Sequence, residues 1–247
     1  VALRLICERE SEIEAFLTDE FWSVDTDFTT TDGGNLSARL THLDGQKLDR
    51  LSLGTEAQAI AAQQRIEAAN WQVSAIETKR VKRRPAPPFT TSTLQQEASR
   101  KLGFSASRTM QIAQKLYEGI NLGSETTGLI TYMRTDGMQM SFEAIGQIRE
   151  AIGQTIGTDF VPTQPRVYKT QAANAQEAHE AIRPTSIWRH PDEVRKRLDF
   201  EQFRLYELIW KRTIASQMAD AQLDQTAADL SATTDQLTMR ANGSVIV

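Results

Sequence analysis

Along the first third of this 247-residue chain, an apolar set with helical spacing comes first and predicts a helix, and alternating apolar and polar residues then predict strands; the helical set is Leu5, Ile6, Ile13, Phe16 and Leu17. Period-two alternation predicts strands over residues 21–29 and 36–43, joined by a turn that contains Asp and Gly. Thr55 is followed three residues later by Gln58, a capping pattern that predicts the start of a helix. Residues 71–78 return to strand alternation, so this part of the chain is predicted to be rich in β-structure.

Three prolines between residues 85 and 88 break this pattern and predict a domain boundary. The residues that follow have the spacing of amphipathic helices. A second capping pattern at Ser92 predicts a helix that ends at Gly103, and Ser105 predicts the start of the next helix. The later elements are predicted to be a helix end at Gly119, a helix capped by Ser141, a helix over residues 200–218, and strands from Gln222.

Residues 128–136 form an apolar, β-prone run that contains Tyr132 and Arg134. In a strand, residues i and i+2 point to the same face, so a tyrosine hydroxyl and a guanidinium would face one substrate atom. A tyrosine that attacks a phosphodiester forms an aryl phosphate ester, and a nearby arginine stabilises the phosphoryl charge in transit. The alternative is a half-buried strand tyrosine, which is the commoner role when Tyr-x-Arg is considered alone.

His179 and Arg183 form a second candidate pair. The sequence His179-Glu180 resembles the start of a zinc-protease motif, but that motif needs a second histidine where this chain has Arg183. A metal site of this kind is therefore excluded. On a helix, positions i and i+4 share a face, so the two side chains would present donors to phosphate oxygens. The alternative is a solvent-exposed helix in which Glu180 pairs with Arg183.

The chain has a net charge of −4 and a pI of about 5.5, which argue mildly against a nucleic-acid partner. The distribution of cations matters more, because phosphates are bound by the patch that faces them. Residues 79–84 carry five cations in six positions, and further cations follow near residues 100–108 and 195–197. One run alone is typical of a solvated face or a linker, whereas several runs around Tyr132 favour a surface that faces DNA.

Several function classes are excluded by features that the sequence lacks. There is no phosphate-binding loop of the Gly-x-x-x-x-Gly-Lys-Ser/Thr type, so ATP hydrolysis is not expected. There is no apolar run of about 18 residues and no cleavable signal, so we expect a cytoplasmic protein without a membrane anchor. The single cysteine, Cys7, excludes an internal disulfide and is expected to be a small core residue.

Four segments together resemble the type IA DNA topoisomerases, in the bacterial topoisomerase I branch. The active-site signature pair of that family is similar to Gly-Leu-Ile-Thr-Tyr-Met-Arg-Thr-Asp at 128–136 and Gln-Glu-Ala-His-Glu-Ala-Ile-Arg-Pro at 176–184. Residues 87–98 and 1–10 are similar to two further family segments, so the resemblance covers the chain nearly end to end. One departure is that many members carry serine where this chain has Gly137.

The resemblance implies a mixed α and β fold, in which a β-rich arch domain carries an inserted, mainly helical domain with the tyrosine. On this basis we expect residues 18–88 and 220–247 to form the arch domain and residues 89–219 the helical domain. Residues 1–17 would be a helix left from an adjoining helical domain. Because neither end of the chain has a capping or turn signal, we expect it to be a fragment of a larger protein.

The resemblance also implies an ATP-independent isomerase that cleaves one DNA strand through a 5′-phosphotyrosine, passes a strand, reseals the break and so relaxes negative supercoils. Tyr132 and Arg134 would be catalytic. The residues expected to bind DNA, especially single-stranded DNA, are His179, Arg183, Thr91, Ser92 and Arg108. In this family an acidic cluster in a separate N-terminal metal-binding (Toprim) domain holds Mg²⁺; no such cluster occurs in this sequence, so no metal ligand is expected in this chain.

The expected partners are therefore DNA, in the bacterial nucleoid, and the missing N-terminal domain, without which the fragment is expected to be inactive. Two alternatives stay open. One is a non-catalytic module that binds single-stranded DNA, and the other is the same fragment from a topoisomerase III or a reverse gyrase. Binding modules of this kind stack bases on exposed aromatic side chains, and the sequence has few aromatics near its basic runs, which favours the enzyme.

Overall fold

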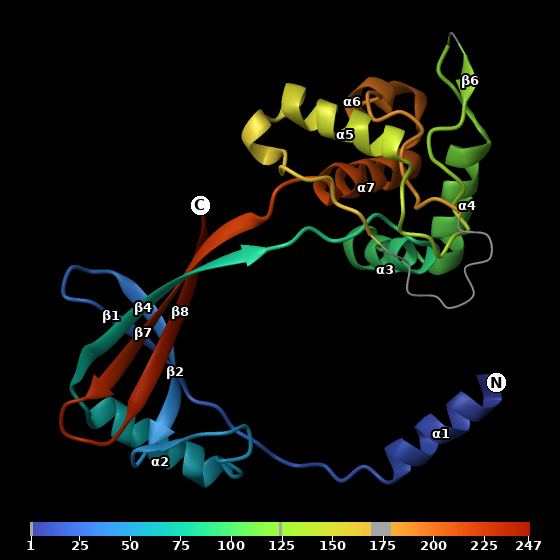
Figure 1. The fold of residues 1–247 in the computed structure, drawn as a ribbon. Helices are drawn as coiled ribbons and strands as arrows, with labels where there is room; N and C mark the ends of the chain where they lie inside the picture. The colour runs from blue at the N-terminus through green and yellow to red at the C-terminus, as the bar shows by residue number, and fades with distance from the viewer. Residues whose placement is uncertain (1, 124, 169–178) are drawn as a thin grey trace. The chain divides into compact units, whose positions relative to one another are not determined.

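The computed structural model of the chain describes residues 2–123, 125–168 and 179–247. The chain divides into two compact units, one made of Val1–Val81 with Gln222–Val247 and the other of Lys82–Ala221. We call them the β unit and the helical unit, and Figure 1 shows the elements of each. The units change at 81/82 and 221/222, whereas the sequence predicts domain limits at 88/89 and 219/220.

The β unit is built on one sheet with the strand order β1-β2-β8-β7-β4, and β3 pairs with β2 (Figure 1). The pairs β1–β2, β2–β8 and β7–β8 are antiparallel. The strands are β1 (Asp25–Thr29), β2 (Asn35–Leu43), β3 (Gln46–Lys47), β4 (Trp71–Arg83), β7 (Ala221–Ala232) and β8 (Thr238–Ile246). Together with the helices this sheet confirms the predicted mixed α and β fold, although β1 begins four residues later than the sequence predicts.

Helix α2 (Glu56–Ala68) packs against this sheet and completes the core of the β unit. Thr55 is its N-cap and accepts a hydrogen bond from the backbone N–H of Gln58, as predicted. Its buried residues pack with sheet and turn residues, namely Ala38, Leu40, Leu230, Leu237, Met239 and Ala241. Helix α1 (Ala2–Glu14) buries no side chain, so the prediction that Cys7 is a core residue is wrong.

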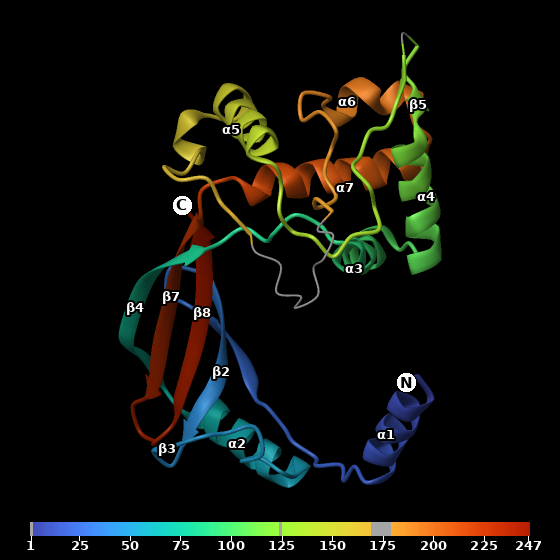
Figure 2. The ribbon, with the colours of Figure 1, turned by 45° about the vertical axis from the view of Figure 1, so that its right-hand side comes forward.

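The helical unit has its own core, formed mainly by three helices that Figure 2 shows grouped together, α3, α4 and α7. The helices are α3 (Thr91–Leu102), α4 (Ala106–Glu118), α5 (Phe142–Thr155), α6 (Pro191–Val194) and α7 (Phe200–Ser216), with a hairpin of β5 (Ile120–Asn121) and β6 (Thr126–Thr127) after α4. Leu94, Leu116 and Leu205 are fully buried where the three helices meet. In the described part of the chain, none of the helices is long and apolar enough to cross a membrane.

Local chemistry explains where these helices begin and end. Gly103 has φ 74°, in the left-handed region that favours glycine, and it ends α3 where the sequence predicts. Ser105 and Ser141 cap α4 and α5, also as predicted. The predicted capping box that begins at Ser92 is wrong, because Thr90 has the extended backbone angles of an N-cap and exchanges both hydrogen bonds with the residue three positions on.

Candidate active site

The run around Tyr132 is not a strand, so the prediction for residues 128–136 is wrong in this respect. Burial nevertheless alternates along it, because Met133 and Thr135 are buried whereas Tyr132 and Arg134 are exposed. Tyr132 is 36% exposed. The candidate nucleophile and the candidate cation are therefore both directed away from the core, without the strand that the sequence predicts.

The backbone of this segment bonds to two neighbours instead of to one strand. The first is the N-terminus of α3, where the hydroxyl of Thr91 donates to the carbonyl oxygen of Met133 at 2.7 Å. The same hydroxyl accepts from the N–H of Thr135 at 2.8 Å, and the N–H of Thr91 donates to the carbonyl oxygen of Thr135 at 2.9 Å. Thr91 thus takes the place of a strand neighbour and fixes the backbone on both sides of Arg134.

The second neighbour is the segment of residues 179–185, which is also irregular. The N–H of Thr131 donates to the carbonyl oxygen of Arg183 at 2.9 Å, and its hydroxyl donates to the carbonyl oxygen of Ala181 at 2.7 Å. That hydroxyl also accepts from the N–H of Arg183 at 3.0 Å. The prediction of a helix over these residues is therefore wrong. Their backbone groups hydrogen-bond to the Tyr132 segment and not to residues three or four positions away, as in a helix.

The Arg183 guanidinium is held by Glu180. Its Nη2 and Nε lie 2.6 and 3.0 Å from Oε2 of Glu180, and its Nη1 donates to the carbonyl oxygen of Pro184 at 3.0 Å. Burial alone would raise the pKa of Glu180, but the Arg183 charge and the N–H of Ser141 outweigh it, so this pKa lies below its ordinary value. Arg183 is 16% exposed and forms the ion pair that the sequence offered as the alternative. Residues 176–178 of the signature lie outside the described residues.

The ring of Tyr132 contacts two other aromatic rings. Tyr117, in the last turn of α4, packs against it in a T-shaped arrangement, with ring centroids 5.5 Å apart and an interplanar angle of 68°. The ring of His179 is 5.3 Å from that of Tyr132, at 58°. Among the described residues nothing hydrogen-bonds to the Tyr132 hydroxyl, so its oxygen is available for chemistry. Tyr117 was not predicted, because the β5–β6 hairpin separates the two tyrosines and no spacing pattern links them.

Two glycines allow these close approaches. A Cβ atom at Gly128 would collide with the backbone carbonyl oxygen of Tyr117, and one at Gly137 would collide with the carbonyl oxygen of His179. Glycine at both positions therefore lets α4 and the His179 backbone reach the Tyr132 segment. Gly137 of this chain thus has a steric role.

The other predicted site residues are Arg134, Arg108 and Ser92, and they lie at different distances from Tyr132. Arg134 has no ion pair among the described residues. Arg108 pairs with Glu201, and along α4 it is about 14 Å from Tyr117, so it is not brought to the tyrosine. Ser92 is the second residue of α3 and is exposed. Of the five residues predicted to bind DNA, Thr91, Arg183 and His179 contact the Tyr132 segment or its ring.

The cations at residues 79–84 lie mostly on β4, which extends farther than the strand predicted over 71–78. Lys79 and Arg80 pair with carboxylates of the sheet. The other three cations of the run have no carboxylate partner within the described ranges. Part of the charge of this run is therefore neutralised within the protein, and part is available to a phosphate backbone.

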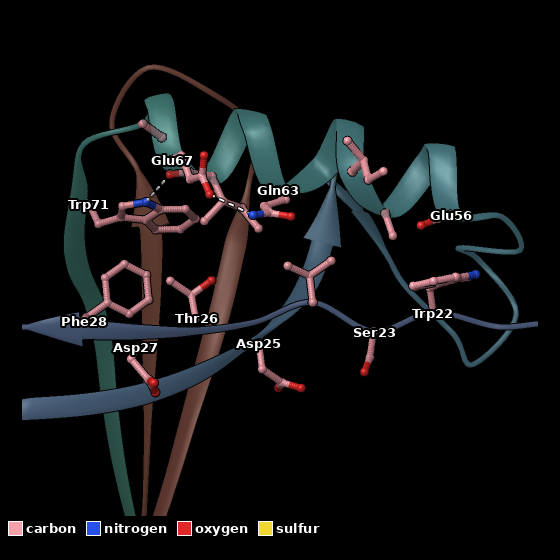
Figure 3. Close-up of a pocket in the computed structure, with 15 residues that line it drawn as sticks. Trp22, Ser23, Asp25, Thr26, Asp27, Phe28, Glu56, Gln63, Glu67 and Trp71 are labelled. Carbon is pink, nitrogen blue, oxygen red and sulfur yellow. Dashed lines mark hydrogen bonds between the residues drawn. The ribbon is translucent and has the colours of Figure 1, made fainter.

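Two other kinds of site would also bear on function, a metal site and a phosphate-binding pocket. Within the ranges that the structure describes, no three His, Cys, Asp or Glu side chains are grouped so that they could hold a metal ion. A hollow of about 780 Å³ lies in the β unit between α2 and β1 (Figure 3). Its lining includes four carboxylates and no lysine or arginine, which makes it unsuited to phosphate; the carboxylates are Asp25, Asp27, Glu56 and Glu67.

Known proteins are similar to this chain along its whole length. The model of the DNA topoisomerase family matches residues 1–247. DNA topoisomerase 1 of Rickettsia felis is 50% identical over 246 residues, which are 100% of this chain and 32% of that protein. DNA topoisomerase 1 of Xylella fastidiosa is 52% identical over 250 residues, 100% of this chain and 30% of that protein. The structure of full-length topoisomerase I from Thermotoga maritima matches with a TM-score of 0.78 at 33% identity, over 99% of this chain and 37% of that one.

The chain therefore belongs to the DNA topoisomerase family, which confirms the resemblance seen in its signature segments. It spans about a third of the length of the curated relatives it matches.

We expect Gly128→Ala to push the Tyr132 segment away from α4. The new Cβ meets a backbone carbonyl, which cannot rotate away, and overpacking of this kind typically costs about 1–3 kcal/mol. Thermal unfolding of the protein should therefore show a lower Tm. Gly146→Ala is the matched control, because that glycine lies within α5 with open space around an added Cβ, and its Tm should stay the same or rise. An unchanged Tm for Gly128→Ala would contradict the close approach.

Proposed function

We propose that Tyr132 is the nucleophile that cleaves a DNA strand in the intact protein. The observation that carries this proposal is the contrast between a segment whose backbone is fixed by hydrogen bonds and the two exposed side chains on it. Tyr132 and Arg134 have no polar partner among the described residues. In a member of the DNA topoisomerase family, a tyrosine and an arginine held in this way suit attack on a phosphodiester.

The proposed reaction is a pair of transesterifications. The Oη of Tyr132 bonds to phosphorus while its proton passes to a base, and the bond from phosphorus to the 3′ oxygen breaks. That oxygen takes up a proton and becomes a free 3′-hydroxyl, while the 5′ end is held as a phosphotyrosine ester. After a strand has passed through the gap, the 3′-hydroxyl attacks the ester, releases the tyrosine and reseals the DNA. The ester keeps the bond energy, so the relaxation of negative supercoils needs no ATP.

Arg134 is proposed to stabilise the charge on the phosphoryl oxygens during both steps. A guanidinium offers planar, paired donors to phosphate, and Arg134 is two residues from the nucleophile on the exposed side of the segment. The N-terminus of α3 supports the same role, because helix N-termini attract anions and Thr91 joins that terminus to the backbone on both sides of Arg134. Ser92, exposed in the first turn of α3, is proposed to contact the same phosphate or the next one.

The remaining predicted DNA contacts are proposed to act in two ways. His179, whose ring packs on that of Tyr132, would donate to the scissile phosphate. Thr91 and Arg183 would act on DNA indirectly, since the Thr91 hydroxyl already bonds to the backbone of the site and the Arg183 guanidinium is already paired with Glu180. Arg108 would meet DNA outside the cleavage site, because it lies toward the other end of α4.

We further propose that the substrate is single-stranded DNA and that the reaction needs Mg²⁺ bound outside residues 1–247, in an N-terminal metal-binding domain. When bound, Mg²⁺ would help to neutralise phosphate charge. The residues of this chain would supply the nucleophile and the guanidinium. The share of the relatives' length that this chain spans, about a third, is compatible with such a division of the active site.

Replacing Tyr132 by phenylalanine in the intact protein should abolish covalent capture of DNA, because phenylalanine lacks the attacking oxygen. A single-stranded oligonucleotide labelled at its 3′ end would report the adduct, since the attached fragment is the one that begins with the 5′ phosphate. Binding of the same oligonucleotide should be retained. An adduct that persists in Tyr132→Phe would show that another residue is the nucleophile.

Arg134→Lys should lower the rate of adduct formation by on the order of 10², because the charge is kept but the paired planar donors are lost. The rate is measured at saturating oligonucleotide. Arg4→Lys, on the exposed surface of α1, is the matched control and should leave the rate unchanged. If Arg134→Lys lowered the Tm in proportion to the rate, a structural role for Arg134 would be the better explanation.

Residues 1–247 alone should fail to relax negatively supercoiled plasmid in the presence of Mg²⁺. We expect this because the fragment would hold the nucleophile without the metal-binding half of the site. The topoisomers are separated by gel electrophoresis, with the intact protein as the positive control. Relaxation that disappears in Tyr132→Phe would show that the chain is catalytically complete and would refute the proposed division.

A further inference from the structure

The orientation of the Tyr132 ring depends on side-chain contacts rather than on secondary structure. Its segment has no strand neighbour, and its hydroxyl has no hydrogen-bond partner among the described residues. An exposed ring in such a setting would move between rotamers unless neighbouring side chains restrict it. Two rings restrict it, those of Tyr117 and His179.

Tyr117 is the more firmly anchored of the two. It belongs to α4, whose inner face is buried in the core of the helical unit through Ile112 and Leu116. The N–H of Leu129 donates to the carbonyl oxygen of Leu116 at 2.7 Å, so the backbone before Tyr132 is bonded to the last turn of the same helix. The ring of Tyr117 therefore reaches Tyr132 from a rigid support.

We propose that Tyr117 is a positioning residue for the nucleophile. Its ring, in T-shaped contact with that of Tyr132, holds the Tyr132 ring in one orientation, so that the Oη is directed toward the scissile phosphate before DNA binds. Aromatic rings prefer this edge-to-face arrangement, and a nucleophile held close to its attack geometry reacts faster than one that must first reorient. This inference rests on the proposed function of Tyr132 and adds a residue that the signature segments do not contain.

The ring of Tyr117, and not its hydroxyl, carries this role. In the described part of the chain nothing hydrogen-bonds to the Tyr117 hydroxyl, and the side chain is 40% exposed. Phenylalanine keeps the ring and should replace it, whereas alanine removes the contact. The exposure also means that alanine leaves no large cavity in the core, so loss of positioning can be separated from loss of stability.

The test compares Tyr117→Ala and Tyr117→Phe in the intact protein, with Mg²⁺ and a 3′-labelled single-stranded oligonucleotide. The rate of adduct formation at saturating DNA, the DNA concentration at half-saturation and the Tm are measured for each. We expect Tyr117→Ala to lower the saturated rate about tenfold with the half-saturating concentration unchanged, and Tyr117→Phe to restore the rate. Phe160→Ala, another half-exposed aromatic of the helical unit, is the matched control and should react at the original rate.

Three results would overturn the role of Tyr117. One is an unchanged saturated rate in Tyr117→Ala, and another is a Tyr117→Phe protein as slow as the alanine variant, which would assign the effect to the hydroxyl. The third is a fall in Tm in Tyr117→Ala, absent in Phe160→Ala, together with weaker DNA binding, as a structural role predicts. Tyr132→Phe is assayed in parallel, because an adduct in that variant refutes the proposed nucleophile, whereas normal adduct formation by Tyr117→Ala refutes only the positioning.

Discussion

Backbone hydrogen bonding of the Tyr132 segment is the constraint on which the rest of the site depends. An irregular segment packed on a core must pair its buried N–H and C=O groups, because one left unpaired costs about 1–3 kcal/mol. Thr91 and Thr131 meet this need with hydroxyls that donate to one backbone group and accept from another. Each hydroxyl thus supplies hydrogen bonds that a neighbouring strand would otherwise make. The side chain of Tyr132 is left exposed.

These hydroxyls act from elements that are themselves well fixed. Phe89 is fully buried, and its carbonyl oxygen accepts from the N–H of Ile182 at 2.8 Å. Thr90 next to it is the N-cap of α3, and Thr91 bonds the Tyr132 segment. Three consecutive residues therefore organise both irregular segments of the site and begin the helix that anchors them. A shift of the α3 N-terminus would move every candidate catalytic group in the helical unit together.

The sequence predicts local features of this fold better than it predicts the site. Helix α3 ends at Gly103 and α4 begins after Ser105. Both limits depend on backbone angles and capping side chains within a few residues, so they can be predicted from the sequence. The strand predicted around Tyr132 and the helix predicted through Arg183 are wrong because each takes its hydrogen bonds from a distant segment. Apolar, β-prone residues indicate burial, but the sequence does not record which neighbour supplies the bonds. Tyr117 could not be found for the same reason.

Arg183 and Arg134 differ in their partners. Arg183 is paired within the protein, whereas Arg134 has no ion pair among the described residues. Both Arg134 and Arg183 belong to signature segments, and for Arg183 the sequence already offers Glu180 as an ion-pair partner. The guanidinium of Arg183 is largely buried against Glu180, and removing it would leave a half-buried carboxylate without its partner, a costly change. Arg134 lies in water, where an unpaired guanidinium is well solvated. Because no internal carboxylate offsets its charge in the described part of the chain, a phosphate that displaces this water meets the full charge.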